Sequence, residues 1–364
     1  MKIMNYADLK KFYKGKRVLV TGHTGFKGSW LSKLLITMGA NVYGYSLMPP
    51  TEPNLYSILN LGQKMNSKLG DIRDFEGLKD YFDEVKPEVV FHLAAQPIVR
   101  DSYKIPRDTY EINVMGTVNI LECIRLSKSC ISFLNVTTDK VYQNSELLEH
   151  SFTEEEKLDG YDPYSNSKSC SELVTHSYRN SFFNLEKHSS NFTKLSTARA
   201  GNVIGGGDFA NDRIIPDCVR ATVAGKTIAV RNPYSIRPYQ HVLEPLYVYL
   251  LIAMEQIYTP ELAGYYNVGP SEQDCITTGE LVNYFINYWG GGSSWKNVSE
   301  VNAPHEANFL KLDCSKLCTS FHWSPIWTAE EAIKQTVLWY KAWANKENMD
   351  SFTERQIESF WGSF

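Results

Sequence analysis

Short apolar runs alternate with longer amphipathic stretches through the first half of the chain. The short runs are rich in β-branched and aromatic residues, which favour strands, and they cover residues 17–22, 40–47, 87–95, 131–138 and 192–200. Between them lie stretches with helical spacing of apolar residues or a helix-start signal, at 26–38, 107–127 and 163–183. Strands that alternate with helices build a parallel sheet covered on both faces. The pattern therefore predicts the α/β class with a doubly wound parallel sheet.

The pattern changes after residue 200. A glycine-rich polar segment, "GNVIGGGDFANDR", is followed by short helical stretches and by connections rich in proline and aromatic residues. Its three consecutive glycines, residues 205–207, fit either a flexible loop or a loop that closes over a ligand. We expect a smaller, mixed α/β domain here. The predicted division gives 1–200 and 237–262 to the domain with the sheet, and 201–236 and 263–364 to the smaller domain.

Composition and charge argue against nucleic acid, a membrane or a metal as a partner of this protein. The 364 residues are 43% hydrophobic and 21% charged, which is typical of a globular protein of about two domains. A net charge of −4 gives no overall attraction for nucleic acid or anionic lipid, and no stretch approaches 18 uninterrupted apolar residues. The seven cysteines are scattered without C-x-x-C pairs, which argues against disulfides or zinc. We expect a cytoplasmic protein with reduced thiols and no metal, membrane or nucleic-acid partner.

A glycine-rich turn follows the first predicted strand directly. In "VTGHTGFKG", Gly22, Gly25 and Gly28 lie three residues apart between that strand and its helix. Glycine there permits a tight turn and a close backbone approach to a pyrophosphate, which the helix N-terminus then faces. The spacing G-x-x-G-x-x-G differs from the usual G-x-G-x-x-G, and a turn without a ligand is the alternative. We expect a Rossmann-type dinucleotide-binding domain.

The residues around this turn leave the dinucleotide open. Ser46 stands near the end of the second strand, where a site for NAD often has an acidic residue. Lys27 lies in the turn and would equally suit the 2′-phosphate of NADP. Asp71, in "LGDIRD", is either an adenine contact at the tip of a third strand or a helix N-cap.

A tyrosine and a lysine lie one helical turn apart in "YDPYSNSK". Tyr164 and Lys168 share one face of a helix whose start is marked by Asp162 and Pro163. A phenol with a pKa of roughly 10 is a poor base at neutral pH, and a nearby cation favours the phenolate. With the glycine-rich turn upstream and Thr138 between them, the pair indicates an oxidoreductase-type site.

Together these motifs resemble the extended short-chain dehydrogenase/reductase family. The resemblance rests on "TGHTGFKG", "HLAAQ", Thr138 and "YSNSK". It implies that Thr138 and Tyr164 hold a sugar hydroxyl that is oxidised, that Tyr164 takes its proton with support from Lys168, and that Asn113 helps to order that lysine. It also implies NAD as the cofactor. The implied NAD contacts are Gly22, Thr24, Gly25, Phe26, Gly28, Asp71, Ile72, Ala94, Gln96, Asn113, Tyr164 and Lys168.

Further blocks resemble the nucleotide-sugar 4,6-dehydratases of that family. They are "TTDKVY", "ARAGNVIGGGDFANDRIIPD", "RPYQHVLEPL" and "HEANFLKLDCSK". The resemblance implies a carbon–oxygen lyase that oxidises C4 of the sugar, loses water across C5–C6 and returns the hydride to C6. NAD would stay tightly bound through the cycle, and the product would feed deoxysugar biosynthesis for O-antigen, capsule or lipopolysaccharide.

The same blocks imply contacts to the nucleotide-sugar substrate. An arginine suits the two oxygens of a phosphate, and Arg237 is expected on the diphosphate. For each implied contact the alternative is a structural salt bridge or a loop residue with satisfied hydrogen bonds. The implied contacts are Asn202, Arg213, Arg237 and His305.

Asp139 and Lys140 follow Thr138 where the fifth predicted strand run gives way to polar residues. Asp139 is the expected acid for the elimination. Related dehydratases for other nucleotide sugars carry glutamate where this chain has Lys140. A lysine there is either neutral and accepts the C5 proton, or charged and stabilises the enolate. The residues leave that choice open.

Two rival functions remain. A nucleotide-sugar 4-epimerase or reductase would need Thr138, Tyr164 and Lys168 but would have no use for the acid/base pair at 139–140. A non-catalytic dinucleotide sensor could dispense with the Tyr–Lys pair. Family likeness also predicts a homodimer that associates through the helices at 107–127 and 163–183.

Overall fold

The centre of the protein is a seven-stranded sheet with the strand order β11-β6-β5-β4-β1-β2-β3, all neighbours parallel. The computed structural model describes residues 6–144, 150–184, 192–299 and 310–363. All five predicted strand runs form strands of this sheet, and the α/β class is confirmed. The strands are β1 (Arg17–Thr21), β2 (Asn41–Ser46), β3 (Asn66–Leu69), β4 (Val89–His92), β5 (Ser132–Thr138), β6 (Lys194–Ala200) and β11 (Tyr265–Val268).

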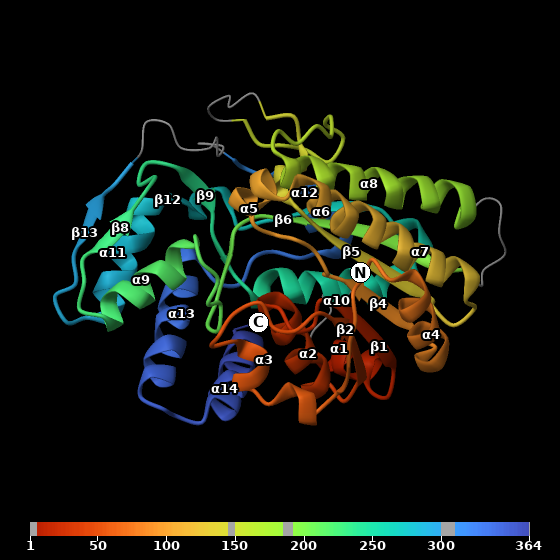
Figure 1. The fold of residues 1–364 in the computed structure, drawn as a ribbon, viewed down its shortest axis with the longest axis horizontal. Helices are drawn as coiled ribbons and strands as arrows, with labels where there is room; N and C mark the ends of the chain where they lie inside the picture. The colour runs from red at the N-terminus through yellow and green to blue at the C-terminus, as the bar shows by residue number, and fades with distance from the viewer. Residues whose placement is uncertain (1–5, 145–149, 185–191, 300–309, 364) are drawn as a thin grey trace.

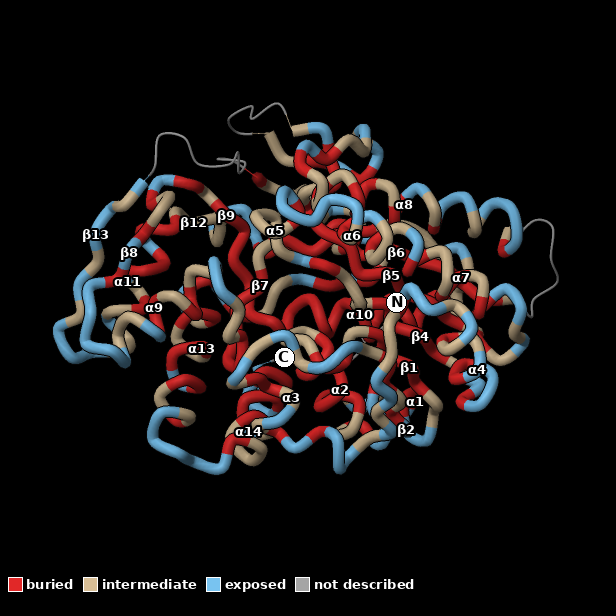
Figure 2. The backbone as a smooth tube through the Cα atoms, viewed as in Figure 1, coloured by how far each residue is buried: buried red, intermediate tan, exposed pale blue. Residues whose placement is uncertain are grey.

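Helices cover both faces of the sheet (Figure 1). Along β1, Val18 and Val20 belong to one apolar core and Leu19 to another, so the strand is buried on both sides. One core lies under α1 (Tyr6–Tyr13), α2 (Phe26–Thr37) and α10 (Leu243–Tyr258). The other lies under α4 (Phe75–Val85), α7 (Gly116–Leu126) and the helix that follows β5, α8 (Pro163–Phe182). Figure 2 shows the central strands of the sheet as buried.

The predicted helix at 107–127 is not regular along its length. It consists of α6 (Pro106–Tyr110), a π-helical turn at Glu111–Met115, and α7. Such turns are rare and often occur at functional sites, and this one contains Asn113. Two shorter helices, α3 (Leu55–Ile58) and α5 (Val99–Lys104), lie in loops that follow β2 and β4.

The second half of the chain forms a smaller part built from three two-stranded sheets and helices (Figure 1). The paired strands are β7 (Val203–Ile204) with β10 (Gln240–His241), β8 (Ile228–Val230) with β13 (Trp295–Asn297), and β9 (Ile236–Pro238) with β12 (Cys275–Thr277). The helices are α9 (Ile214–Val223), α11 (Thr278–Trp289), α12 (Ser315–Phe321), α13 (Ala329–Ala344) and α14 (Met349–Trp361).

Two predicted boundaries differ from the structure. The predicted return to the sheet, segment 237–262, forms mainly the buried helix α10. The strand that joins the large sheet, β11, begins only after this segment, at Tyr265. The C-terminal helix α14 packs on α2, where buried Lys33 pairs with Asp350 and Glu354 at 2.7 Å each. The division into two domains stays a prediction, but these two elements lie with the sheet.

The glycines at 205–207 are explained by packing. A Cβ on Gly206 would lie 2.0 Å from the Trp339 ring, and one on Gly205 would lie 2.8 Å from Val242. The Gly206 carbonyl also accepts a hydrogen bond from the Trp30 indole at 2.9 Å. This segment is therefore held against α13 and α2 rather than free.

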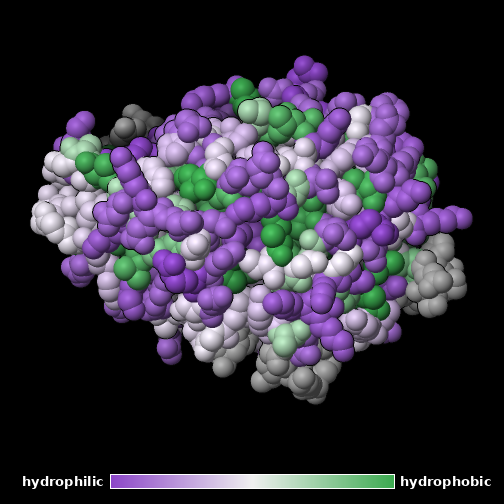
Figure 3. All heavy atoms as spheres, turned by 90° about the horizontal axis from the view of Figure 1, so that it is seen from below, coloured by the Kyte–Doolittle hydropathy of each residue, from purple (hydrophilic) through white to green (hydrophobic). Residues whose placement is uncertain are grey.

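The surface carries apolar groups in small patches. In the view of Figure 3, hydrophobic residues form several separate groups among polar ones. Within the described part of the chain, no helix is both long and apolar enough to cross a membrane.

Replacing Gly206 by alanine should lower the free energy of unfolding by about 1–3 kcal/mol, because the added methyl group would overlap the Trp339 ring. Gly264→Ala is a matched control, since the nearest atoms to its added Cβ lie 3.7 Å away. Urea denaturation of both variants measures the difference as a shift in midpoint. Equal midpoints would contradict this explanation.

Candidate active site

A large cavity opens at the carboxyl ends of β1, β4 and β5. The strand order reverses between β1 and β4, and open α/β sheets bind their ligands at such a switch point. The cavity has a volume of about 900 Å³ and is closed on the other side by the segment 200–217 and by residues 229–239. It therefore lies between the sheet and the smaller part of the protein.

The glycine-rich turn forms a cradle at one end of the cavity. Gly22 has a φ of 76°, and a Cβ there would lie 2.8 Å from the Ala94 nitrogen. A Cβ on Gly28 would lie 2.1 Å from the Gly22 carbonyl oxygen, so α2 crosses β1 at a distance that only glycine permits. The N-cap residue Gly25 makes no side-chain hydrogen bond, which leaves the first amides of α2 without a side-chain cap. This arrangement suits the pyrophosphate of a dinucleotide.

Six of the other predicted cofactor contacts line the same cavity. Thr24 donates to the Leu47 carbonyl at 2.9 Å and shares a hydrogen bond with Ser46 at 2.8 Å, which fixes the end of β2. The six are Thr24, Phe26, Asp71, Ile72, Tyr164 and Lys168, beside the cradle residues Gly22, Gly25, Gly28 and Ala94.

Asp71 is not a helix N-cap. The N-cap of α4 is Asp74, whose side chain accepts from the Gly77 amide. Asp71 instead holds Arg73 through both carboxylate oxygens, with the closest contact at 2.6 Å, and the Arg73 guanidinium lowers the pKa of Asp71. It remains on the cavity wall, where an adenine contact is still open to it.

Gln96 and Asn113 do not line the cavity but support its wall. The Asn113 amide accepts from the Gln96 backbone N–H at 2.9 Å and donates to the Ser167 hydroxyl at 2.9 Å. Both residues are buried. Asn113 thus ties the loop after β4 to the residue that precedes Lys168. Among the described residues its side chain bonds to Gln96 and Ser167 and not to the lysine itself.

The short turn after β5 carries the three residues predicted for oxidation and elimination. Thr138 caps a 3-10 turn at Asp139–Val141. One oxygen of Asp139, Oδ1, accepts from the Thr138 hydroxyl at 3.0 Å and from the Lys140 ammonium at 3.1 Å. The other, Oδ2, is buried with no hydrogen-bond partner among the described residues, and a side chain at Gly201 would come within 3.2 Å of it. Asp139 therefore has one oxygen committed and one available.

Tyr164 and Lys168 reach this turn from the start of α8, as predicted. Lys168 is buried and donates to the Val136 carbonyl of β5 at 3.1 Å. Burial lowers the pKa of Lys168 to about 8, while the Glu172 carboxylate one turn later opposes that shift. The pKa of Tyr164 is not lowered overall, although a nearby cation favours the phenolate. Burial raises that pKa to about 12, and the groups that oppose the shift are Thr138 and Arg213.

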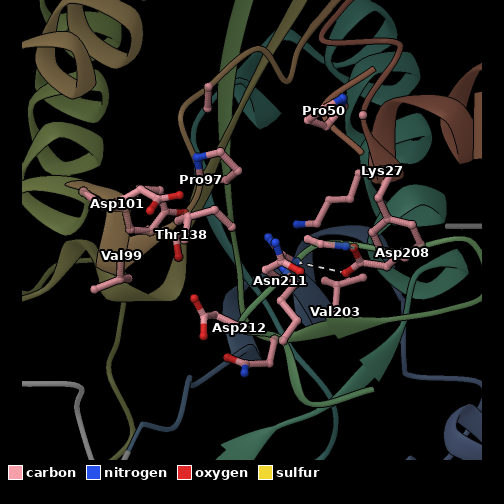
Figure 4. Close-up of a pocket in the computed structure, with 18 of the residues that line it drawn as sticks. Lys27, Pro50, Pro97, Val99, Asp101, Thr138, Val203, Asp208, Asn211 and Asp212 are labelled. Atoms are coloured by element: carbon pink, nitrogen blue, oxygen red, sulfur yellow. Dashed lines mark hydrogen bonds and ion pairs between the residues drawn. The ribbon is translucent and has the colours of Figure 1, made fainter. Parts of the chain in front are cut away.

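Lys27 is a site residue that the sequence argument assigned elsewhere. Its side chain extends from α2 into the cavity on the side opposite Thr138 (Figure 4). Burial, and after it the Arg213 guanidinium, lower its pKa to about 7, and the Asp139 carboxylate opposes the shift. A cation in the first turn of a helix opposes the helix dipole, and that was the available signal for a functional role.

Three of the four predicted substrate contacts lie on the cavity wall. Arg237 is buried and donates only to the Ile236 carbonyl, at 3.4 Å, so among described residues it has no carboxylate partner. Arg213 pairs with Asp208 at 3.5 Å, which is the salt bridge considered as its alternative. Asn202 lies on the wall beside them. His305 lies outside the described residues.

Positive charge exceeds negative charge around the reacting end of the cavity. Lys140 pairs with Asp139 at 3.1 Å, and Arg213 lowers the pKa of Tyr164. Arg213, Lys168 and Lys140 each lower the pKa of Lys27. An anionic ligand such as a diphosphate would reduce the repulsion between these cations. The arrangement can thus bind a phosphate-bearing sugar and move protons at Tyr164 and Asp139.

Comparison with known proteins agrees with this geometry. The sequence model for "GDP-mannose 4,6 dehydratase" matches residues 19–336. A Salmonella typhimurium protein named CDP-glucose 4,6-dehydratase is 48% identical over 96% of this chain and 98% of its own length. A Haemophilus influenzae dTDP-glucose 4,6-dehydratase is 24% identical over 89% of this chain and 97% of its own.

Solved structures share the fold. A UDP-glucose 4-epimerase from Thermus thermophilus, solved with NAD, has a TM-score of 0.77 at 23% identity over 89% of this chain and 98% of its own. A dTDP-glucose 4,6-dehydratase from Bacillus anthracis, also with NAD, has a TM-score of 0.73 at 23% identity, over 89% and 96%. With a family match across most of its length, the chain belongs to the GDP-mannose 4,6 dehydratase family.

Proposed function

We propose that this protein is a CDP-D-glucose 4,6-dehydratase, a carbon–oxygen lyase that forms CDP-4-dehydro-6-deoxy-D-glucose and water. The observation that carries the proposal is the 48% identity over 96% of the chain to a relative of that name. The cavity supports it, because Thr138, Asp139, Lys140, Tyr164 and Lys168 all line its wall beside the glycine cradle. Epimerases and dehydratases share this fold, so the turn at 139–140 is the more specific feature.

The residues of the cradle fit NAD. Bound NAD+ would supply the hydride acceptor for the C4 oxidation and the donor for the final reduction. Lys27, the residue considered for a 2′-phosphate of NADP, extends into the cavity (Figure 4), where Arg213 and Asp139 both shift its pKa. Ser46 is hydrogen-bonded to Thr24. Gly22, Gly25 and Gly28 would hold the pyrophosphate, and Asp71 and Ile72 would lie beside the adenosine.

In the oxidation, Tyr164 takes the proton of the glucose 4-hydroxyl while Thr138 holds the same oxygen. Burial raises the pKa of the Tyr164 phenol to about 12, so the phenolate is harder to form here than in water. The groups that lower this pKa, Thr138 and Arg213, come from two different walls of the cavity. The phenolate is therefore favoured only when positive charge is concentrated around the bound sugar.

In the elimination, the C5–H and C6–O bonds break and a C5–C6 double bond forms. For this step Asp139 must carry a proton, and its buried Oδ2, which has no hydrogen-bond partner among the described residues, can hold it. Asp139 gives that proton to the leaving 6-hydroxyl, which departs as water, and the C5 proton leaves to a base. Lys140 acts here as a hydrogen-bond donor, to Asp139 Oδ1 at 3.1 Å, and a donating nitrogen is placed to stabilise negative charge. We therefore propose that Lys140 stabilises the enolate that forms when C5 loses its proton, rather than accepting that proton itself.

We also propose a homodimer and a cytoplasmic location. α7 and α8 pack side by side, and apolar residues on them are exposed to solvent. These are Met115 (50%), at the end of the π-helical turn, and Leu126 (51%), Leu173 (52%) and Phe182 (45%). All seven cysteines are free thiols, which suits a reducing compartment.

Incubation of the purified protein with CDP-glucose and NAD+ should yield a 4-keto-6-deoxy sugar, followed by the absorbance such sugars develop in alkali. Product from another nucleotide sugar but not from CDP-glucose would retain the chemistry and reject the cytidine assignment. Epimerised or reduced sugar without water loss would favour the rival enzymes. No product from any nucleotide sugar would favour a dinucleotide sensor.

Lys140→Met should slow turnover about 100-fold, with a KM close to that of the parent protein, because the charge acts on the transition state rather than on binding. Lys140→Arg keeps a cation that does not lose its proton, and it should recover at least about a tenth of the parent rate. Steady-state kinetics with CDP-glucose measures both. An arginine variant as slow as the methionine variant would instead favour Lys140 as the proton acceptor.

Leu173→Glu should convert the dimer to monomer at micromolar concentration, because a charge would be placed in the centre of the α7–α8 surface. Val223→Glu is the control, since Val223 is 60% exposed on α9, away from that surface. Sedimentation equilibrium gives both masses. A monomeric parent protein would contradict the proposal.

A further inference from the structure

The turn at Asp139–Val141 is bonded at both of its ends to one buried polar network. The turn itself has little internal support, because the hydrogen bond that caps it, from the Lys140 amide to the Thr138 hydroxyl, is 3.5 Å long. Thr137 precedes the turn and Tyr142 follows it, and both side chains are buried. Each is hydrogen-bonded to one member of the same ion pair, Glu172 with Arg199.

At the first end, Thr137 is fixed to α8. Its hydroxyl donates to Glu172 Oε1 at 2.5 Å. The other oxygen, Oε2, accepts from Thr197 of β6 at 2.7 Å and from Arg199 at 3.0 Å. Glu172 also lies one helical turn beyond Lys168, so the carboxylate that holds the end of β5 stands on the helix that brings in Lys168 and Tyr164.

At the second end, Tyr142 joins the other side of the pair. Its hydroxyl accepts from Arg199 Nη1 at 2.8 Å and donates to Asn267 Oδ1 of β11 at 2.6 Å. The Tyr142 ring stacks on Phe152 with centroids 5.0 Å apart and planes 4° apart. Because the hydroxyl hydrogen is bonded to Asn267, Tyr142 cannot donate it to a ligand in the cavity.

The network runs across neighbouring strands in register. Thr137 of β5 lies opposite Arg199 of β6, and Arg199 lies opposite Asn267 of β11. Glu172 and Arg199 are each about 3% exposed, so both charges are removed from water. A buried ion pair contributes little net stability compared with apolar residues of the same shape. The pair is bonded to the residues on both sides of one short turn, Thr137 and Tyr142. We therefore infer that it positions the turn.

We propose that the Thr137–Glu172–Arg199–Tyr142 network positions the turn that carries Asp139 and Lys140 for the elimination step. Proton transfer to a leaving hydroxyl depends on the placement of the acid to a fraction of an ångström. Tyr142 fixes the end of the turn beyond Lys140, whereas Thr138, Tyr164 and Lys168 are held by β5 and α8. Loss of the Tyr142 tether should therefore affect water loss more than C4 oxidation. This inference rests on the proposed dehydratase function.

Tyr142→Phe removes the tether and leaves both buried charges paired. In single-turnover reactions with CDP-glucose, quenched and analysed by mass spectrometry, the rate of water loss should fall roughly tenfold while C4 oxidation stays within about twofold. The 4-keto sugar that still carries its 6-hydroxyl should then accumulate. The KM should change little, because the hydroxyl hydrogen that the variant lacks is bonded to Asn267 and not to the substrate.

Thr137→Val and Thr197→Val form a matched pair. Each removes one buried hydroxyl that donates to Glu172, at 2.5 Å and 2.7 Å, but only Thr137 adjoins the turn. Their urea midpoints should shift alike, whereas only Thr137→Val should slow water loss. An equal loss of activity in both variants would reduce the network to a structural role and overturn the inference. Equal slowing of oxidation and water loss in Tyr142→Phe would do the same.

Hydrogen exchange gives a test that needs no turnover. Amides in the peptide 137–143 should exchange faster in Tyr142→Phe than in the parent protein, and at the parent rate in Thr197→Val. If the parent protein does not act on CDP-glucose, the proposed function fails, and this exchange experiment still decides whether the network holds the turn. Unchanged exchange in Tyr142→Phe would contradict the inference.

Discussion

The pairing of β5 with β6 along its whole length determines where the reactive groups lie. Seven consecutive residue pairs, from Ser132 opposite Lys194 to Thr138 opposite Ala200, leave β5 no freedom to slip, since a shift of one residue would turn every side chain to the other face. The strand therefore delivers Thr138 to the sheet edge and begins the turn with Asp139. Helix α8 is fixed to the same strand by the bond from Lys168 to the Val136 carbonyl, and to the turn by the bond from Ser169 to the Val141 carbonyl.

Charge at this edge is arranged for an anionic ligand. The protein as a whole carries a net charge of −4, yet Lys27, Lys140, Lys168 and Arg213 all line the cavity near Asp139. Burial lowers the pKa of Lys27 to about 7 and of Lys168 to about 8, which expresses the cost of holding a cation away from water. For Lys27 the nearby Arg213 guanidinium adds to that cost. Phosphate groups would offset that cost. Affinity for a nucleotide sugar and readiness for proton transfer thus have the same electrostatic origin.

The sequence predicted the strands and the glycine-rich turn well because the patterns that indicate them are local. A run such as "ISFLNVTT" specifies a buried strand from its own residues, and Gly22, Gly25 and Gly28 are required by a crossing that only a few neighbouring atoms define. The misses depend on contacts distant in sequence. The domain boundary missed β11 because its place in the sheet depends on pairing with β6, and the pKa of Tyr164 depends on burial that no local pattern records. The role of Lys27 was left open because its direction is set by the first turn of α2 and not by a local sequence pattern.

Enzymes that share this fold can catalyse different reactions because a few residues of the site differ. A 4-epimerase with a TM-score of 0.77 shares the sheet and its cover of helices, so the overall fold does not separate oxidation alone from oxidation followed by loss of water. In this chain the difference would lie in one turn of three residues, Asp139–Val141. A turn that short has too few bonds of its own to hold an acid and a cation at 3.1 Å. Its geometry must come from its surroundings. The buried pair of Glu172 with Arg199 supplies part of it through Thr137 and Tyr142, and Ser169 supplies part through its bond to the Val141 carbonyl.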